Sequence, residues 1–297
     1  MKKLKLLDTF SGIGGFSYAA EKLVGGFETT QFIEIEPYCQ KVLKKHWPNV
    51  PIHDDSKTFT AKPFQFDAVC GGFPCQSIST AGKGEGITET SKSGMWFELI
   101  RTIRMVRPKY FILENVSAIL ANGLDIVLRD IYKAGYDAEW CCIPSSFVGA
   151  CHQRDRWWLV GFPSDPDHYG SSSTKESRST KKTNGGSEER KNKALNIKRS
   201  SESRNTETFQ HDVTNPDINR LQREVGSRLH RATWKTQNIR RINKNWRQYE
   251  SKSVLCRGDD GLRNRVDRLK ALGNSVVPQV AAIPLQRVLD LENERQA

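Results

Sequence analysis

LLDTFSGIGGF, residues 6–16, is the stretch that decides the fold class of this 297-residue chain. Its apolar start predicts a buried strand, and its glycines predict a tight turn that opens a helix. Glycines let the backbone approach a ligand, and a helix N-terminus offers free N–H groups. The spacing departs from G-x-G-x-x-G because Ser17 stands in the third place, which weakens an NAD-binding interpretation.

Residues 1–163 repeat this alternation of short apolar runs and helical patterns, which is typical of an α/β protein with a mostly parallel sheet. The expected strands are 3–10, 29–36, a short one near 51–55, 66–72, 109–116, 138–144 and 156–162. The expected helices are 15–24, 37–46, 95–106 and 123–134. The segment 263–297 returns to a core-like composition, with a helix after Pro278, so we expect it to complete this first domain.

The intervening block, residues 164–262, is polar and basic, and we expect it to be an insertion into that domain. Residues 164–258 hold 21 basic and 11 acidic residues, which is +10 of the chain's total charge of +12. Such a charge favours a polyanionic partner, although a solvated surface has the same composition. The stretch 170–205 is typical of a linker or a disordered segment. Candidate DNA contacts in the block are Arg228, Arg231, Lys235, Arg240, Arg241, Lys244 and Arg247, with Trp234, Trp246 and Tyr249 interleaved.

Composition also argues against several classes of protein. None of the seven cysteines forms a C-x-x-C pair, so we expect neither a zinc site nor a disulfide framework, and a reducing compartment fits better. The opening MKKLKLL is interrupted by Asp8 and does not resemble a signal peptide. No apolar run approaches the length of a membrane span. We therefore expect a cytoplasmic protein that does not bind membranes.

Acidic residues end the second and third expected strands. Glu34 and Glu36 suit the two hydroxyls of a ribose, and Asp54 or Asp55 suits an adenine amino group. Together with the glycine turn they predict an adenosine pocket, although solvated acids beside an ordinary turn would give the same pattern.

A second group of candidates lies where later strands end. Cys75 stands in GGFPCQSIST (71–80), directly after a buried strand, and Glu114 ends the next one. Arg154 and Arg156 alternate in CHQRDRWW (151–158), so both face one side if that stretch is extended. A thiolate can attack electrophilic carbon, a protonated carboxyl can donate to a ring nitrogen, and guanidiniums can hold a carbonyl oxygen.

Five motifs in order give the chain a family resemblance: DTFSGIGGF, GGFPCQSIS, ENV, HQRDR and LKALGNSVVPQVA. It resembles the C5-cytosine DNA methyltransferases over roughly two thirds of its length. The resemblance implies a Rossmann-like S-adenosylmethionine-dependent methyltransferase fold with a small inserted DNA-recognition domain at 164–262. It also implies double-stranded DNA as the partner, a monomeric protein and no metal. The implied setting is restriction-modification or phage protection in a bacterial or phage-infected cell, where a restriction endonuclease can be paired with the enzyme.

The resemblance assigns roles to the reactive group. A cytosine flipped out of the duplex is attacked at C6 by Cys75, while Glu114 holds N3 and the amino group. Arg154 holds O2 and steadies the Cys–Glu arrangement, and Arg156 supports it. C5 then takes the methyl group of S-adenosylmethionine, leaving S-adenosylhomocysteine, and loss of the C5 proton expels the thiol.

The same resemblance gives the binding positions. Those for the cofactor are Phe10, Ser11, Gly12, Ile13, Gly15, Glu34, Asp55, Gly72, Pro74, Asn274 and Ser275. Those for DNA, besides the basic insertion, are Gln76, Ser79 and Lys83, the last two within an expected closing loop at 79–94.

Two features depart from the family pattern. His152 and Gln153 stand where many members have Pro-Gln and a basic residue, and GDDGLRNRVDRLK (258–270) replaces the usual penultimate motif. An RNA cytosine-C5 methyltransferase is a near alternative, but the Cys-Phe-Thr signature of one tRNA-modifying branch is missing. A catalytically silent DNA-binding regulator is a second alternative, against which the four reactive residues argue. A NAD-dependent oxidoreductase fits least well.

Overall fold

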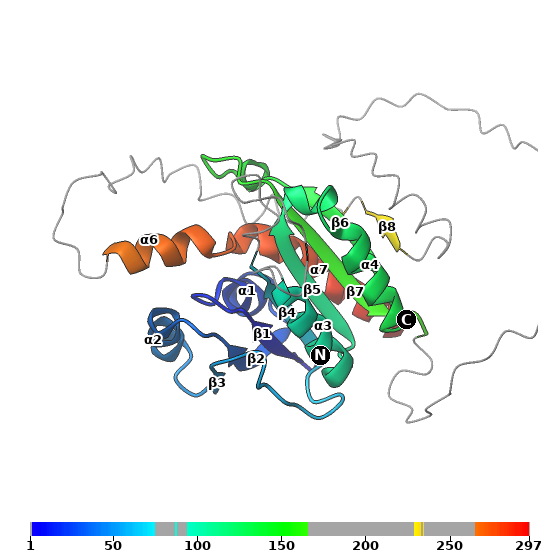
Figure 1. Cartoon of the computed structure of the whole chain (residues 1–297), viewed down its shortest axis with the longest axis horizontal. Helices are drawn as coiled ribbons and strands as arrows, with labels where there is room; N and C mark the ends of the chain where they lie inside the picture. Colours follow the sequence, from blue (N-terminus) through cyan, green and yellow to red (C-terminus); the bar gives the residue numbers. More distant parts are fainter. Residues whose placement is uncertain are drawn as a thin grey trace, which may run out of the picture.

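The computed structural model describes residues 2–74, 87, 94–165, 229–232, 234 and 265–296. Within these residues one sheet has the strand order β3-β2-β1-β4-β5-β7-β6-β8 (Figure 1). The strands are β1 (Leu4–Thr9), β2 (Phe27–Ile33), β3 (Ile52–His53), β4 (Ala68–Gly72), β5 (Tyr110–Val116), β6 (Tyr136–Ile143), β7 (Arg156–Pro163) and β8 (Leu229–Arg231). The order 3-2-1-4-5 is that of a doubly wound α/β fold, so the expected fold class is confirmed.

The sheet is parallel from β3 to β5, and its one antiparallel strand is β7, which pairs with β5 and with β6. The connection from β6 to β7 covers only residues 144–155 and holds a single 3₁₀ turn, Ser145–Val148. It contains no α-helix, which is the usual crossover between parallel strands, and such a connection suits an antiparallel partner. β8 then pairs parallel with the outer side of β6.

Helices cover both faces of the sheet. They are α1 (Gly15–Tyr18), which continues as the π-helix η1 (Ala19–Val24), α2 (Pro37–His46), α3 (Met95–Val106), α4 (Leu124–Lys133), α6 (Arg265–Asn274) and α7 (Pro278–Gln296). Figure 1 shows α3 and α4 on one side of the sheet and α7 on the other. The residues of β5 alternate accordingly: Phe111 and Leu113 pack with α3 and α4, while Tyr110 and Ile112 pack with α1, η1 and α7.

The expected elements are found with small shifts. β2 ends at Ile33, so Glu34 and Glu36 follow it, and the expected helix 15–24 is divided between α1 and η1. α6 was not expected from the sequence. Its polar composition gives no clear apolar face, and in the structure Val266, Leu269 and Leu272 are exposed. Among the described residues, no helix combines the length and apolar character needed to cross a membrane.

A buried carboxylate attaches the described part of the basic block to the sheet. Glu139 on β6 is 4% exposed, and its Oε1 accepts hydrogen bonds from Trp234 Nε1 at 3.0 Å and from Arg287 Nε at 2.6 Å. The amide of Ala232 donates to the carbonyl of Trp140 beside it. β6, the segment 229–234 and α7 therefore share one polar contact inside an apolar cluster.

Candidate active site

The glycine turn after β1 is built from residues in left-handed backbone conformations. Phe10, Gly12 and Gly14 have φ angles of 52°, 55° and 85°. A Cβ on Gly14 would lie 2.6 Å from the ring of Trp47, so a larger residue is excluded there by packing as well as by φ. Phe10 is the non-glycine member, and its strained conformation fits a site where the backbone serves a ligand.

Glu34 closes this turn from the end of β2. Its two carboxylate oxygens accept from the amide of Gly12 at 2.6 Å and from the amide of Glu36 at 2.8 Å. Burial raises the pKa of Glu34, and the backbone donors oppose that rise. Each oxygen has a second lone pair, so the carboxylate can still accept from a hydroxyl. Glu34 therefore shapes the turn in addition to the ribose contact expected from the sequence.

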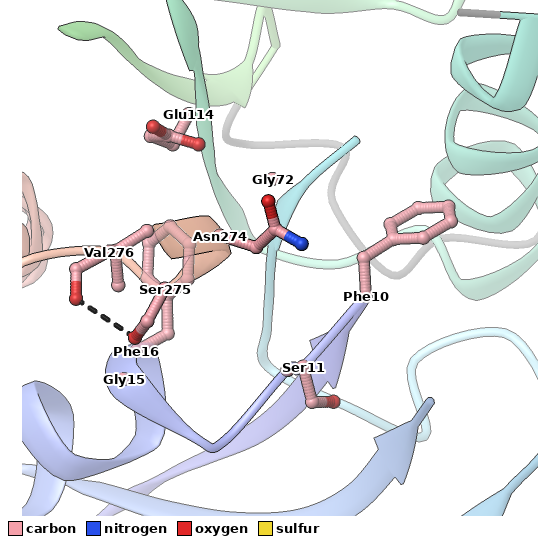
Figure 2. Close-up of a pocket in the computed structure, with 10 residues that line it drawn as sticks. Phe10, Ser11, Gly15, Phe16, Gly72, Glu114, Asn274, Ser275 and Val276 are labelled. Atoms are coloured by element: carbon pink, nitrogen blue, oxygen red, sulfur yellow. Dashed lines mark hydrogen bonds between the residues drawn. The ribbon is translucent and has the colours of Figure 1, made fainter. Parts of the chain in front are cut away.

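A cavity joins the glycine turn to the end of β5 (Figure 2). It is lined by Phe10, Ser11, Gly12, Gly15, Phe16, Gly72, Glu114, Asn274, Ser275 and Val276. Seven of the eleven expected cofactor positions are among them, while Ile13, Glu34, Asp55 and Pro74 are not. Phe16 and Val276 also line the cavity, although neither was expected from the sequence. Each lies directly beside an expected contact, Gly15 in the first motif and Ser275 in the last.

The motif LKALGNSVVPQVA (269–281) reaches the cavity by packing closely against Gly15. A Cβ on Gly15 would lie 2.7 Å from Cγ2 of Val276 and 3.1 Å from Oγ of Ser275. Gly15 thus makes room for the chain between α6 and α7 as well as for a ligand. Figure 2 shows Asn274, Ser275 and Val276 beside Phe16, with Glu114 on β5 beyond them.

Glu114 is the carboxyl group at the far end of this cavity. Its Oε1 forms an ion pair with Arg156 Nε at 3.0 Å, and its side chain is 12% exposed. A Cβ on Gly72 would lie 2.7 Å from Oε2, so a larger residue there would displace the carboxyl group. Burial raises the pKa of Glu114, although the charges of Arg156 and Arg154 oppose the rise. A carboxyl group held in this way can keep a proton and donate it to a ring nitrogen.

The backbone turns at Arg154, two residues before β7 begins. The φ of Arg154 is 34° and β7 begins only at Arg156, so the extended stretch that would bring both arginines to one side does not form. The reversal of the chain before β7 requires the turn. Nη2 of Arg154 donates to the carbonyls of Gly273 and Ser275, both at 2.8 Å. Both guanidinium charges nevertheless act on Glu114.

Several expected site residues lie outside the described part of the chain: Cys75, Gln76, Ser79, Lys83, Arg228, Lys235, Arg240, Arg241, Lys244 and Arg247, together with the side chain of Arg231. The described range that precedes Cys75 ends at Pro74. Just before it, Asn115 Nδ2 donates to the carbonyl of Phe73 at 3.2 Å. The residue after Glu114 thus holds the backbone two positions before Cys75. In the described ranges, no cluster of three or more His, Cys, Asp or Glu side chains could hold a metal ion.

The sequence model of the family described as C-5 cytosine-specific DNA methylase matches residues 4–263. The chain belongs to this family. The match covers the strands from β1 to β8, including Glu114 and both arginines, and it ends before α6.

Individual members of the methylase family show the same relationship. The chain is 33% identical to Type II methyltransferase M.CviJI of Paramecium bursaria Chlorella virus IL3A, over 54% of this chain and 44% of that protein. It is 32% identical to Type II methyltransferase M.NgoBV of Neisseria gonorrhoeae, over 56% and 43%. It is 30% identical to Orphan methyltransferase M.SPRI of Bacillus phage SPR, over 56% and 39%. The chain thus spans less than half the length of these relatives.

Proposed function

We propose that this methylase transfers a methyl group from S-adenosylmethionine to C5 of a flipped cytosine in a specific duplex DNA sequence. The observation that carries the proposal is Glu114, a carboxyl that is only 12% exposed and has a raised pKa. It is paired with Arg156 at one end of a cavity that begins at the glycine turn. Family membership and the names of the relatives support the same reaction.

The described residues fit the proposed cofactor. The cavity is bounded by turn backbone on one side and by the polar side chains of Asn274 and Ser275 on the other. A Cβ on Gly12 would meet nothing within 4 Å, which leaves open space for a ligand above the turn. Glu34 and Asp55 would hold the ribose and the adenine, and Asn274 and Ser275 would complete the pocket. When bound, S-adenosylmethionine supplies an electrophilic methyl group.

The protein's own groups would handle the cytosine. The sulfur of Cys75 would form a bond to C6 and leave when the C5 proton is lost. Glu114 would hold a proton at N3 during the attack, which its raised pKa favours. Arg156 would fix the carboxyl group in place, and Pro74 and Asn115 would fix the backbone that carries the thiol.

The block 164–262 is proposed to recognise the target sequence. Its strong positive charge supports contact with phosphates, and β8 and Trp234 attach part of it to the catalytic sheet. The relatives include type II and orphan methyltransferases, which supports a role in restriction-modification or in the protection of phage DNA.

The test is transfer of labelled methyl groups from S-adenosylmethionine to mixed-sequence duplex DNA, with bisulfite sequencing of the product. The wild type should produce methylcytosine within one short motif, and Cys75→Ser should produce none. A parallel reaction on total RNA separates the alternatives. Methylation of RNA alone would refute the DNA substrate, and equal activity of Cys75→Ser would refute the covalent step. Cofactor binding without transfer to either nucleic acid would favour a silent regulator.

A further inference from the structure

We propose that Arg154 is a positioning residue of the cofactor pocket, which it shapes by holding the carbonyls of Gly273 and Ser275. This inference rests on the proposed function. It departs from the cytosine contact that the family resemblance implies for Arg154, and it assigns the direct hold on Glu114 to Arg156.

The carbonyls in question lie where α6 ends. The last carbonyls of a helix have no partner within the helix, and a cation near that end is favourable. The next helix begins with Pro278, which has no N–H to offer. A single guanidinium nitrogen of Arg154 meets both carbonyls at 2.8 Å. Arg154 therefore serves as the cap of α6 from a distant part of the sequence.

The backbone of Arg154 is held in place for this task. Its φ of 34° is unfavourable for a residue with a side chain, so the surroundings must maintain it. Ser145, which is 1% exposed, donates its hydroxyl to the carbonyl of Arg154 at 3.4 Å and its amide to the carbonyl of Gln153 at 2.6 Å. The turn that directs the guanidinium toward α6 is thus anchored in the core.

The capped segment forms one wall of the cavity. Asn274, Ser275 and Val276 line it, and Val276 and Ser275 lie against Gly15 of the glycine turn. Loss of the Arg154 contacts would free the carbonyls on both sides of Asn274. We therefore expect the pocket to lose its order while the ion pair between Arg156 and Glu114 stays in place.

Arg129→Met is the control, because it also removes a positive charge but belongs to a surface pair with Asp125 that does not line the cavity. S-adenosylmethionine binding is measured by calorimetry without DNA. We expect the dissociation constant to rise about tenfold in Arg154→Met and to stay the same in Arg129→Met, where tenfold corresponds to about 1.4 kcal/mol. Arg154→Lys keeps the charge but lacks the planar fork of donors, so its dissociation constant should lie between those of the wild type and Arg154→Met.

A second readout does not need the cofactor. Amide hydrogen exchange at residues 274–277 should be faster in Arg154→Met than in the wild type and unchanged in Arg129→Met. Equal cofactor affinities of the two methionine variants, or unchanged exchange in Arg154→Met, would overturn the inference. If the wild type binds no S-adenosylmethionine, the proposed function fails, and the exchange experiment alone decides whether Arg154 holds the segment.

Discussion

Replacing Arg287 with methionine should destabilise the protein by about 2–3 kcal/mol. The change leaves the carboxylate of Glu139, only 4% exposed, without its charged partner on α7. Removing one member of a buried ion pair costs about 3–5 kcal/mol. We expect less here because the side chain of Arg287 is 26% exposed, which lets water reach the vacated position, and because Trp234 still donates to Glu139.

Urea denaturation of three variants tests this reasoning. The double variant Glu139→Gln/Arg287→Met has no buried charge, while glutamine keeps an oxygen for Trp234, so it should cost only about 1 kcal/mol. The double variant should therefore be more stable than Arg287→Met alone. Arg129→Met serves as the control, because Arg129 pairs with Asp125 at 3.8 Å with half of its side chain exposed, and should change stability by less than about 0.5 kcal/mol. A double variant as unstable as Arg287→Met would refute the argument from the buried charge.

Three further changes test other parts of the structure. Burial raises the pKa of Asp8 from 3.8 to about 7. Between these two values the native state binds a proton that the unfolded state does not. The free energy of unfolding should therefore fall by up to about 1.4 kcal/mol per pH unit as pH rises from about 4 to 7. Asp8→Asn should remove that slope in urea titrations, and an unchanged slope would contradict the assignment. Gly161→Ala should cost about 3 kcal/mol, because its Cβ would overlap the ring of Phe111, and a thermal midpoint equal to the wild type's would exclude the overlap. Arg156→Met should raise the pKa of Glu114 in a carboxyl carbon-13 titration, since it removes the nearest opposing charge, and a lower pKa would reverse the electrostatic picture.

The strands and most helices follow from local sequence patterns, because apolar periodicity and glycine turns act over a few residues. The expected strand at 66–72 and the helix at 95–106 agree with β4 and α3 to within two residues. Asn274 and Ser275 were placed in the pocket by their motif, and the cavity contains both.

The features that the sequence could not predict depend on long-range contacts. Arg154 takes its conformation from a turn anchored by Ser145, and its partners lie about 120 residues further along the chain. The sequence shows Glu34 only as an acid near the end of a strand, which is a common pattern. Only the folded turn shows that the amide of Gly12 donates to its carboxylate. The π-helical form of Ala19–Val24 likewise has no signature in its residues.

The pairing around β6 fixes the two points between which residues 164–228 are inserted into the sheet. β7 ends at Pro163 opposite Tyr136, and β8 resumes at Leu229 opposite Ala138, on the other side of the same strand. The chain thus leaves and rejoins the sheet roughly 10 Å apart, two strand spacings. Doubling the length of a loop between fixed ends costs only about 0.6 kcal/mol. Segments of very different length should therefore fit between these two points without a change to the sheet.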